Sequence, residues 1–141
     1  MCMNDETPVI DVVDLDHVAI RVQDLDAALT FYVDVLGMET RDRDRFENGD
    51  VPFVSLVAGG RHIHVVPTDE LINVENEHIC YLLRSKHVDS KAELVAILDQ
   101  IADAGYDVLQ DEPKKRFGAY GRGWAGYVRD PDGRIVELKL H

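Results

Sequence analysis

Three things are scarce in this sequence: cysteine, basic residues and long apolar runs. Only two of its 141 residues are cysteine, Cys2 and Cys80, so no disulfide framework is expected and reduced thiols are the simpler interpretation. No apolar run approaches the ~20 residues of a membrane-spanning helix, and the N-terminus MCMNDETPVID is acidic where a signal or transit peptide would be basic. These absences favour a soluble cytoplasmic protein.

The shortage of basic residues also limits the partners. The chain has 15 Lys and Arg against 27 Asp and Glu, which gives a formal net charge of −12. Binding to nucleic acid without sequence preference requires clustered cations that neutralise phosphates, and an anionic membrane attracts the same cations. We therefore expect neither nucleic acid nor a membrane as partner. The length is sufficient for one domain with its own core.

The first half of the chain reads as strand, helix and three strands. Residues 1–14 carry acids and no base, and we interpret them as a tail. A β-branched apolar run predicts a strand at 15–22, and Asp24 then caps a helix that Gly37 ends. Three strand-like segments complete this module, which spans 15–67, with a Gly59-Gly60 turn before the last of them: 38–46, 51–58 and 62–67.

The second half repeats this order. After a polar linker at 68–77 comes a strand at 78–83, and Ser90 with Glu93 forms a capping box for an amphipathic helix. Three further strands are predicted, the last two joined by the turn Asp130-Pro131-Asp132-Gly133: 106–110, 124–129 and 134–140. The sequence thus predicts an α+β fold of two tandem βαβββ modules, 15–67 and 78–141, within one domain at 15–141.

Four residues at equivalent places in these modules can bind a metal: His17, His64, His78 and Glu137. Period-two alternation directs each of them to one face of its strand. A curved sheet that closes around a cup would direct all four to one centre. Three imidazoles and one carboxylate suit a divalent Zn, Fe, Ni or Mn ion rather than Ca or Mg.

Three stretches of the sequence carry a resemblance to a known family: LDHVAIRVQDLDAALTFYVDVLGMET, ENEHICYLL and YVRDPDGRIVEL. They resemble the vicinal oxygen chelate superfamily, which includes glyoxalases, bleomycin-resistance proteins and extradiol dioxygenases. The resemblance implies a curved, mixed but mostly antiparallel sheet around a metal-binding cup, with His17, His78 and Glu137 as ligands and His64 as a fourth ligand. It also implies a homodimer whose chains share or exchange modules, so that the ligands come from one chain or from two.

Three reaction classes remain open from the sequence. Four protein ligands on an octahedral ion leave two positions for a substrate that chelates through neighbouring oxygens, which favours Lewis-acid chemistry of the isomerase or lyase type. Glu137, His62 or His64 would then move the proton. An Fe(II) extradiol-type dioxygenase would use three ligands with Tyr127 as acid or base. A protein that binds or modifies an antibiotic such as fosfomycin or bleomycin is the third class.

One cationic segment stands out in this acidic chain. Residues 114–122, KKRFGAYGR, hold four cations and no acid, and the two glycines among them, Gly118 and Gly121, suggest a mobile loop near the rim of the cup. We expect this loop to cover the site and to recognise a small anionic substrate through Arg122, Lys115 and Tyr120. Arg21, on the same strand face as His17, is a further candidate for this contact.

Overall fold

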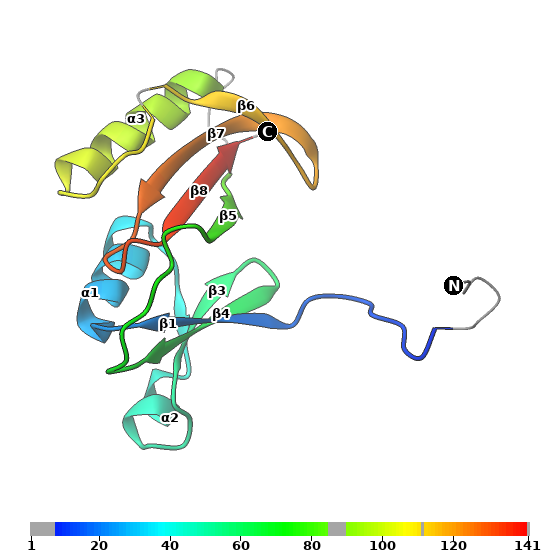
Figure 1. Ribbon diagram of the computed structural model, residues 1–141, viewed down its shortest axis with the longest axis vertical. Coiled ribbons are helices and arrows are strands. Elements are labelled where there is room, and N and C mark those ends of the chain that lie inside the picture. Colours follow the sequence, from blue (N-terminus) through cyan, green and yellow to red (C-terminus); the bar gives the residue numbers. More distant parts are fainter. Residues whose placement is uncertain (1–7, 85–89, 111, 141) are drawn as a thin grey trace.

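The computed structural model describes residues 8–84, 90–110 and 112–140, and it contains two stacked units joined by a long connector (Figure 1). Each unit is a four-stranded mixed sheet with a helix against one face, in the predicted βαβββ order. The α+β prediction is confirmed. The two sheets do not join into one closed sheet around a cup.

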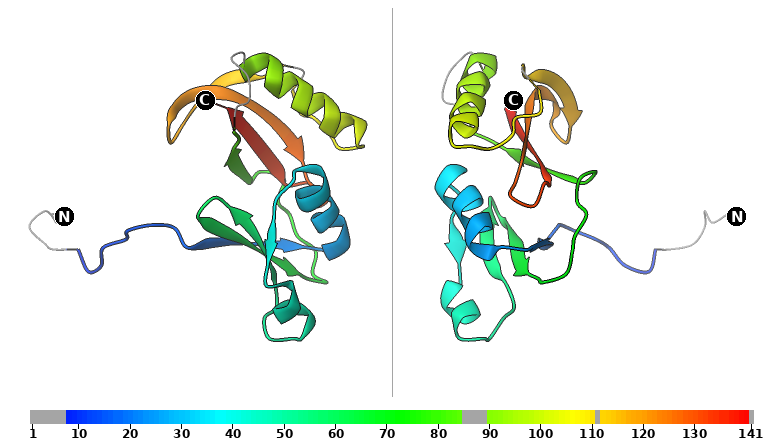
Figure 2. Two further views of the ribbon diagram at one scale, coloured as in Figure 1. Left: turned by 180° about the vertical axis from the view of Figure 1, so that it is seen from behind. Right: turned by 60° about the vertical axis from the view of Figure 1, so that its left-hand side comes forward.

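The first sheet has the strand order β1-β4-β3-β2. The edge strand β1 (His17–Val22) runs parallel to β4 (Arg61–Pro67), and β3 (Val54–Ala58) and the short β2 (Thr40–Arg41) follow antiparallel. Before β1, residues 8–16 form an extended arm that leaves the body of the molecule (Figure 2). The large apolar side chains of this arm are all exposed: Val9, Ile10, Val12, Val13 and Leu15.

The helix of the first unit begins as predicted. Asp24 caps α1 (Leu25–Leu29) by accepting a hydrogen bond from the backbone N–H of Ala27, and the helix continues as the π-helix η1 (Thr30–Val35). Gly37 follows with a φ of +78°, a left-handed conformation that ends the helix. The buried face of this helix packs on β1, β3 and β4 through Ala28, Phe31 and Tyr32.

The strand predicted at 38–46 is wrong over most of its length. Only Thr40 and Arg41 pair with β3, and the short helix α2 (Arg43–Glu47) follows. Asp42 takes a left-handed conformation with φ +58° and turns the chain out of the sheet. Of the five residues after it only Phe46 is apolar, and the others are charged and exposed, so this stretch lacks the alternating apolar side chains that bury one face of a strand.

The second sheet has the strand order β5-β8-β7-β6. In it β5 (His78–Leu82) runs parallel to β8 (Ile135–Leu140), which pairs antiparallel with β7 (Gly121–Arg129), and β7 pairs with β6 (Lys114–Gly118). One face of this sheet is covered by α3 (Ser90–Asp103), which begins at the predicted residue. Its buried side chains are Leu94, Leu98 and Ile101.

Two predictions for the second unit are wrong. Residues 106–110 form no strand, since only Val108 makes an isolated bridge, to Val128. Residues 114–122 are not a mobile loop, because β6 and β7 form a hairpin in which 114–118 pair with 121–125. The two glycines that end these strands, Gly118 and Gly121, make the tight turn, so the glycines indicated a hairpin rather than a loop.

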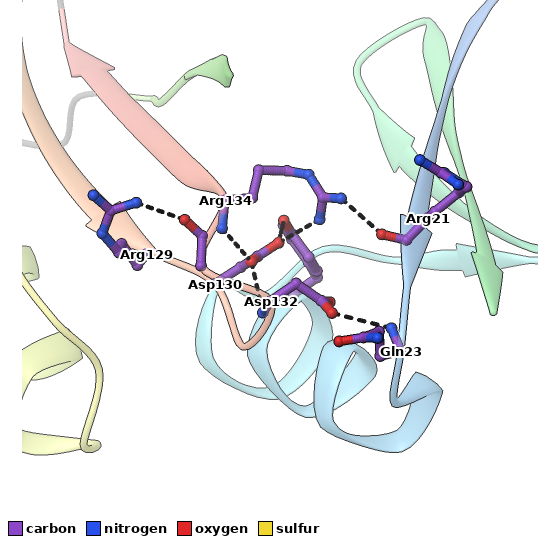
Figure 3. Close-up of polar contacts among 8 residues, drawn as sticks. Arg21, Gln23, Arg129, Asp130, Asp132 and Arg134 are labelled. Carbon is purple, nitrogen blue, oxygen red and sulfur yellow. Dashed lines mark hydrogen bonds and ion pairs between the residues drawn. The ribbon is translucent and has the colours of Figure 1, made fainter. Parts of the chain in front are cut away.

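The two units are joined by a buried polar network at the turn between β7 and β8 (Figure 3). Asp130 Oδ2 accepts hydrogen bonds from the hydroxyl of Tyr32 at 2.6 Å and from Arg134 Nη1 at 2.7 Å. Arg134 Nη2 donates to the backbone carbonyl of Arg21 at 2.7 Å, and Asp132 Oδ1 accepts from the backbone N–H of Gln23 at 3.0 Å. The turn of the second unit is therefore fastened to β1 and the first helix.

None of the helices in the described parts of the chain is long and apolar enough to span a membrane.

Candidate functional site

Each sheet has one face packed against a helix and an opposite face that carries the chemically active side chains. On the first sheet, the pairing of His17 with His62 and the two-residue alternation of β4 place His17, His62 and His64 on the face away from α1. On the second sheet, the pairs Cys80 to Glu137 and Tyr127 to Glu137 place these groups in one row on the face away from α3. We call these two faces the open faces.

The histidines of the first open face form a stack. The rings of His17 and His64 lie with centroids 4.0 Å apart, and Phe53 covers the other side of His64 at 3.8 Å. His62 lies beside them, its centroid 6.4 Å from that of His64. The packing of His64 between two rings holds its imidazole in a fixed orientation.

The protonation of this stack suits a metal ligand. Burial, and then the nearby His17 and His62, lower the pKa of His64, so its imidazole is neutral at neutral pH and its nitrogen lone pair is available. Asp16 Oδ1 lies 2.6 Å from His17 Nδ1. A hydrogen bond donated by Nδ1 to this carboxylate leaves Nε2 free to bind an ion, the arrangement common around metal-bound histidines. The same bond lowers the pKa of Asp16.

The second open face holds the other pair of predicted ligands. His78 Nε2 lies 3.4 Å from Glu137 Oε1, and Glu137 is buried although it carries a carboxylate. Burial and then the charge of Glu137 raise the pKa of the Cys80 thiol to about 11. Burial and Glu137 also raise the pKa of Tyr127, whereas the Arg116 guanidinium opposes this shift. Three ionisable groups, His78, Cys80 and Tyr127, therefore lie around one buried carboxylate, and Arg116 lies next to Tyr127.

One chain does not bring the four predicted ligands together. Within residues 8–84, 90–110 and 112–140, no group of three or more His, Cys, Asp or Glu side chains is arranged to hold a metal ion. The ligands instead form two pairs, one on each sheet: His17 with His64, and His78 with Glu137. Each pair lies on the open face of its own sheet.

The residues predicted to bind substrate lie away from these pairs. Lys115 and Arg122 alternate onto the face of the hairpin that carries Trp124, and the Lys115 ammonium lies 5.4 Å from the Trp124 ring centroid. Tyr120 is 73% exposed in the hairpin turn. Arg21 shares its strand face with His17, but it is exposed and pairs with Glu70 at 3.4 Å.

Arg116 was not among the sequence candidates, yet it faces Glu137. It pairs with Gly123 in the hairpin, and alternation along β7 places this pair on the same face as Tyr127. Once the register of β6 against β7 is known, strand alternation identifies it: the side chains of Lys114 and Arg116 point away from those of Lys115 and Phe117.

The fold agrees with the comparisons with known proteins. The family model described as the Glyoxalase/Bleomycin resistance protein/Dioxygenase superfamily matches residues 14–138, and the chain belongs to this superfamily. Among curated relatives, it is similar to a probable lactoylglutathione lyase of Synechocystis, with 27% identity over 86% of this chain and 91% of that protein.

Solved structures share its fold. An integron cassette protein from Vibrio cholerae matches with a TM-score of 0.69 and 24% identity over 94% of this chain and 98% of that chain. A fosfomycin resistance protein, FosX, from Listeria monocytogenes matches with a TM-score of 0.65 and 20% identity over 93% and 95% of the two chains.

Proposed function

We propose that this protein is a metal-dependent small-molecule enzyme whose site is completed by a second copy of the chain. His17 and His64 of one chain and His78 and Glu137 of the other would bind a single divalent ion. The observation that supports this best is the division of the ligands into two ordered pairs that do not meet within one chain. A twofold dimer in which units are exchanged would form two such sites.

The donor set fits a borderline divalent ion. Two neutral imidazoles from the first open face and one imidazole and one carboxylate from the second are ligands that Zn²⁺, Ni²⁺, Mn²⁺ and Fe²⁺ accept. The contact of His17 with Asp16 is the support that metal-binding histidines usually have. Such an ion would act as a Lewis acid on a substrate bound through two neighbouring oxygens, which favours isomerase, lyase or addition chemistry.

The residues around the ligands would handle protons and position the substrate. His62 lies beside the stacked histidines but outside the ligand set, so it is the candidate for the base. Tyr127 pairs across the sheet with Glu137, and burial raises its pKa above the ordinary value of 10, so its hydroxyl is protonated at neutral pH and would donate a hydrogen bond. Both roles need only the side chains already present on the two open faces.

A test of the shared site uses two inactive half-site variants. His17→Ala with His64→Ala removes the first pair, and His78→Ala with Glu137→Ala removes the second. Each variant alone should bind no Zn²⁺. If the two are mixed, unfolded in urea and refolded together, random pairing should restore about one quarter of the wild-type sites. The measurement is bound zinc per chain after gel filtration.

The controls decide between three outcomes. The separately refolded variants set the background, and refolded wild type sets the maximum. No recovery in the mixture, with zinc bound by the wild type, would show that one chain supplies all four ligands. A wild type that binds neither zinc, nickel, manganese nor iron would refute the metal-dependent function.

Oxygen uptake with catechols by the iron-loaded protein would instead support the dioxygenase alternative with Tyr127.

A further inference from the structure

The open face of the second sheet is cationic, although the chain as a whole is strongly acidic. Strand alternation and the pairing of β6, β7 and β8 place four cations on this face with the single acid Glu137. An acidic protein that gathers basic residues beside a buried carboxylate creates a local field that attracts anions. The four cations of this face are Lys114, Arg116, Arg129 and Lys139.

Two of these cations have structural roles already. Arg129 Nη1 donates a hydrogen bond to the backbone carbonyl of Gly133 at 2.6 Å. Lys139 is only 3% exposed, and its ammonium lies against Gly118, 2.6 Å from the point that a Cβ on this glycine would occupy. Both side chains contact neighbouring parts of the fold, and they add positive charge to this face.

Arg116 is the cation that lies at a pocket. The structure places a cavity of about 370 Å³ beside β6 and β7, large enough for a small metabolite. Within the described chain, Arg116 makes no ion pair with a carboxylate, so its guanidinium can accept an anionic partner. The cavity is lined by His78, Leu109, Gln110, Arg116, Tyr127 and Ile135.

We propose that this cavity binds an oxyanion of the substrate, a carboxylate, phosphonate or phosphate group, with Arg116 as the main contact and Tyr127 beside it. A planar guanidinium can donate two parallel hydrogen bonds to such a group. His78 lines the same cavity and contacts Glu137, so an anion bound there would lie next to the proposed metal ligands. The inference rests on the proposed function and deepens it by naming the substrate class: a small oxyanion with a neighbouring oxygen for the metal.

Charge alone would not distinguish Arg116 from the other cations of the hairpin. Lys115 and Arg122 belong to the same hairpin, but they lie on its other face, where Lys115 is close to Trp124. Arg122 is thus a matched control for Arg116: it has the same side chain and the same hairpin, but it lies on the opposite face.

The experiment measures methylphosphonate binding by ³¹P NMR to the full-length protein without metal and again after loading with zinc. The wild type should bind saturably in both states. Arg116→Met should weaken binding by about tenfold or more, because two charge-assisted hydrogen bonds are lost. Arg122→Met should bind like the wild type. Arg116→Lys should bind with intermediate affinity, because it keeps the charge and loses the paired geometry.

Each outcome bears on one claim. Equal weakening by Arg116→Met and Arg122→Met, or no saturable binding by the wild type, would overturn the inference. The zinc-free arm separates it from the proposed function: binding that depends on Arg116 would stand even if zinc never binds. Conversely, zinc binding with no effect of either Arg116 variant would leave the metal function intact and refute the oxyanion site. Near-ultraviolet circular dichroism confirms that each variant is folded.

Discussion

Two buried tyrosine hydroxyls differ in whether they have a partner. The hydroxyl of Tyr32 donates to Asp130 Oδ2 at 2.6 Å, whereas the hydroxyl of Tyr81 is buried and has no partner among the described residues. A hydrogen bond to a charged group stabilises a fold, whereas a buried polar atom without a partner destabilises it. Replacing each tyrosine by phenylalanine removes one buried hydroxyl, so the two variants can be compared directly for their effect on stability.

We predict opposite effects of Tyr32→Phe and Tyr81→Phe. The first should lower the free energy of unfolding by about 1.5–3 kcal/mol, because Asp130 loses a donor in a buried site. The second should leave stability unchanged or raise it by about 1 kcal/mol, because only an unpaired hydroxyl is removed. Urea unfolding followed by Trp124 fluorescence measures both. A loss with Tyr81→Phe as large as that with Tyr32→Phe would contradict this account.

For the candidate site, the sequence was most informative about which residues could bind a metal. His17, His64, His78 and Glu137 stand out because few residue types bind metals and these occupy equivalent places in a repeat. Equivalent strands of the two sheets carry them, with β1 beside β4 in the first sheet and β5 beside β8 in the second; their role as ligands stays a prediction. Arg116 could not be selected from its neighbours, because four cations occur within nine residues and only strand register distinguishes their faces.

At the scale of elements, the close approach of α3 to β7 depends on a glycine. A Cβ added to Gly126 would lie 2.7 Å from Leu98 Cδ1 and 3.1 Å from Cδ2. Leu98 is buried in the core, so it cannot move aside without disturbing its neighbours. The absence of a side chain at this position lets the helix pack directly on the strand.

Gly126→Ala is accordingly expected to lower the free energy of unfolding by about 1–3 kcal/mol, as overpacking of a core does. Gly60→Ala is the control, since a Cβ at that position meets nothing within 4 Å; its effect should stay within about 0.5 kcal/mol. Thermal unfolding of both variants tests the difference. A neutral Gly126→Ala would mean that α3 can shift outward at little cost.

Elements with a strong apolar pattern and a cap were predictable from the sequence. The helix beginning at Ser90 and the strands β1, β4 and β8 carry such patterns. The segments 38–46 and 106–110 were mispredicted, because short apolar or charged runs do not show whether a neighbouring strand is available for pairing. The hairpin at 114–122 was missed because its strand is mostly exposed and cationic, a composition typical of loops.

At the scale of the molecule, one buried ion pair joins the two units, beside the apolar core that both units share. The Asp130 and Arg134 side chains are 0% and 4% exposed, and they bond to Tyr32 and to the backbone of β1. A charge buried this deeply destabilises the fold if its partner is removed, because it is then left without a counter-charge. This network joins the turn between β7 and β8 to β1 and to the first helix (Figure 3).

We predict that Asp130→Asn uncouples the units. The amide leaves the Arg134 guanidinium buried without a counter-charge, which should cost roughly 3–5 kcal/mol. Unfolding of the second unit, followed by Trp124 fluorescence, should then separate from unfolding of the first, followed by hydrogen exchange of β1 and β4 amides. Asp14→Asn, which removes an exposed contact with Arg61, should change little. Coincident transitions in Asp130→Asn would show that other contacts join the units.

The outer part of the arm before β1, residues 8–13, exposes the folded protein to proteolysis. These residues are extended and carry exposed β-branched side chains, and an exposed extended segment is the form that endoproteases bind. None of the buried core residues comes from this stretch. A cut within 8–13 would leave both sheets in place, together with the contacts of Asp14 with Arg61 and of Asp16 with His17, so degradation can start there without immediately destroying the folded protein.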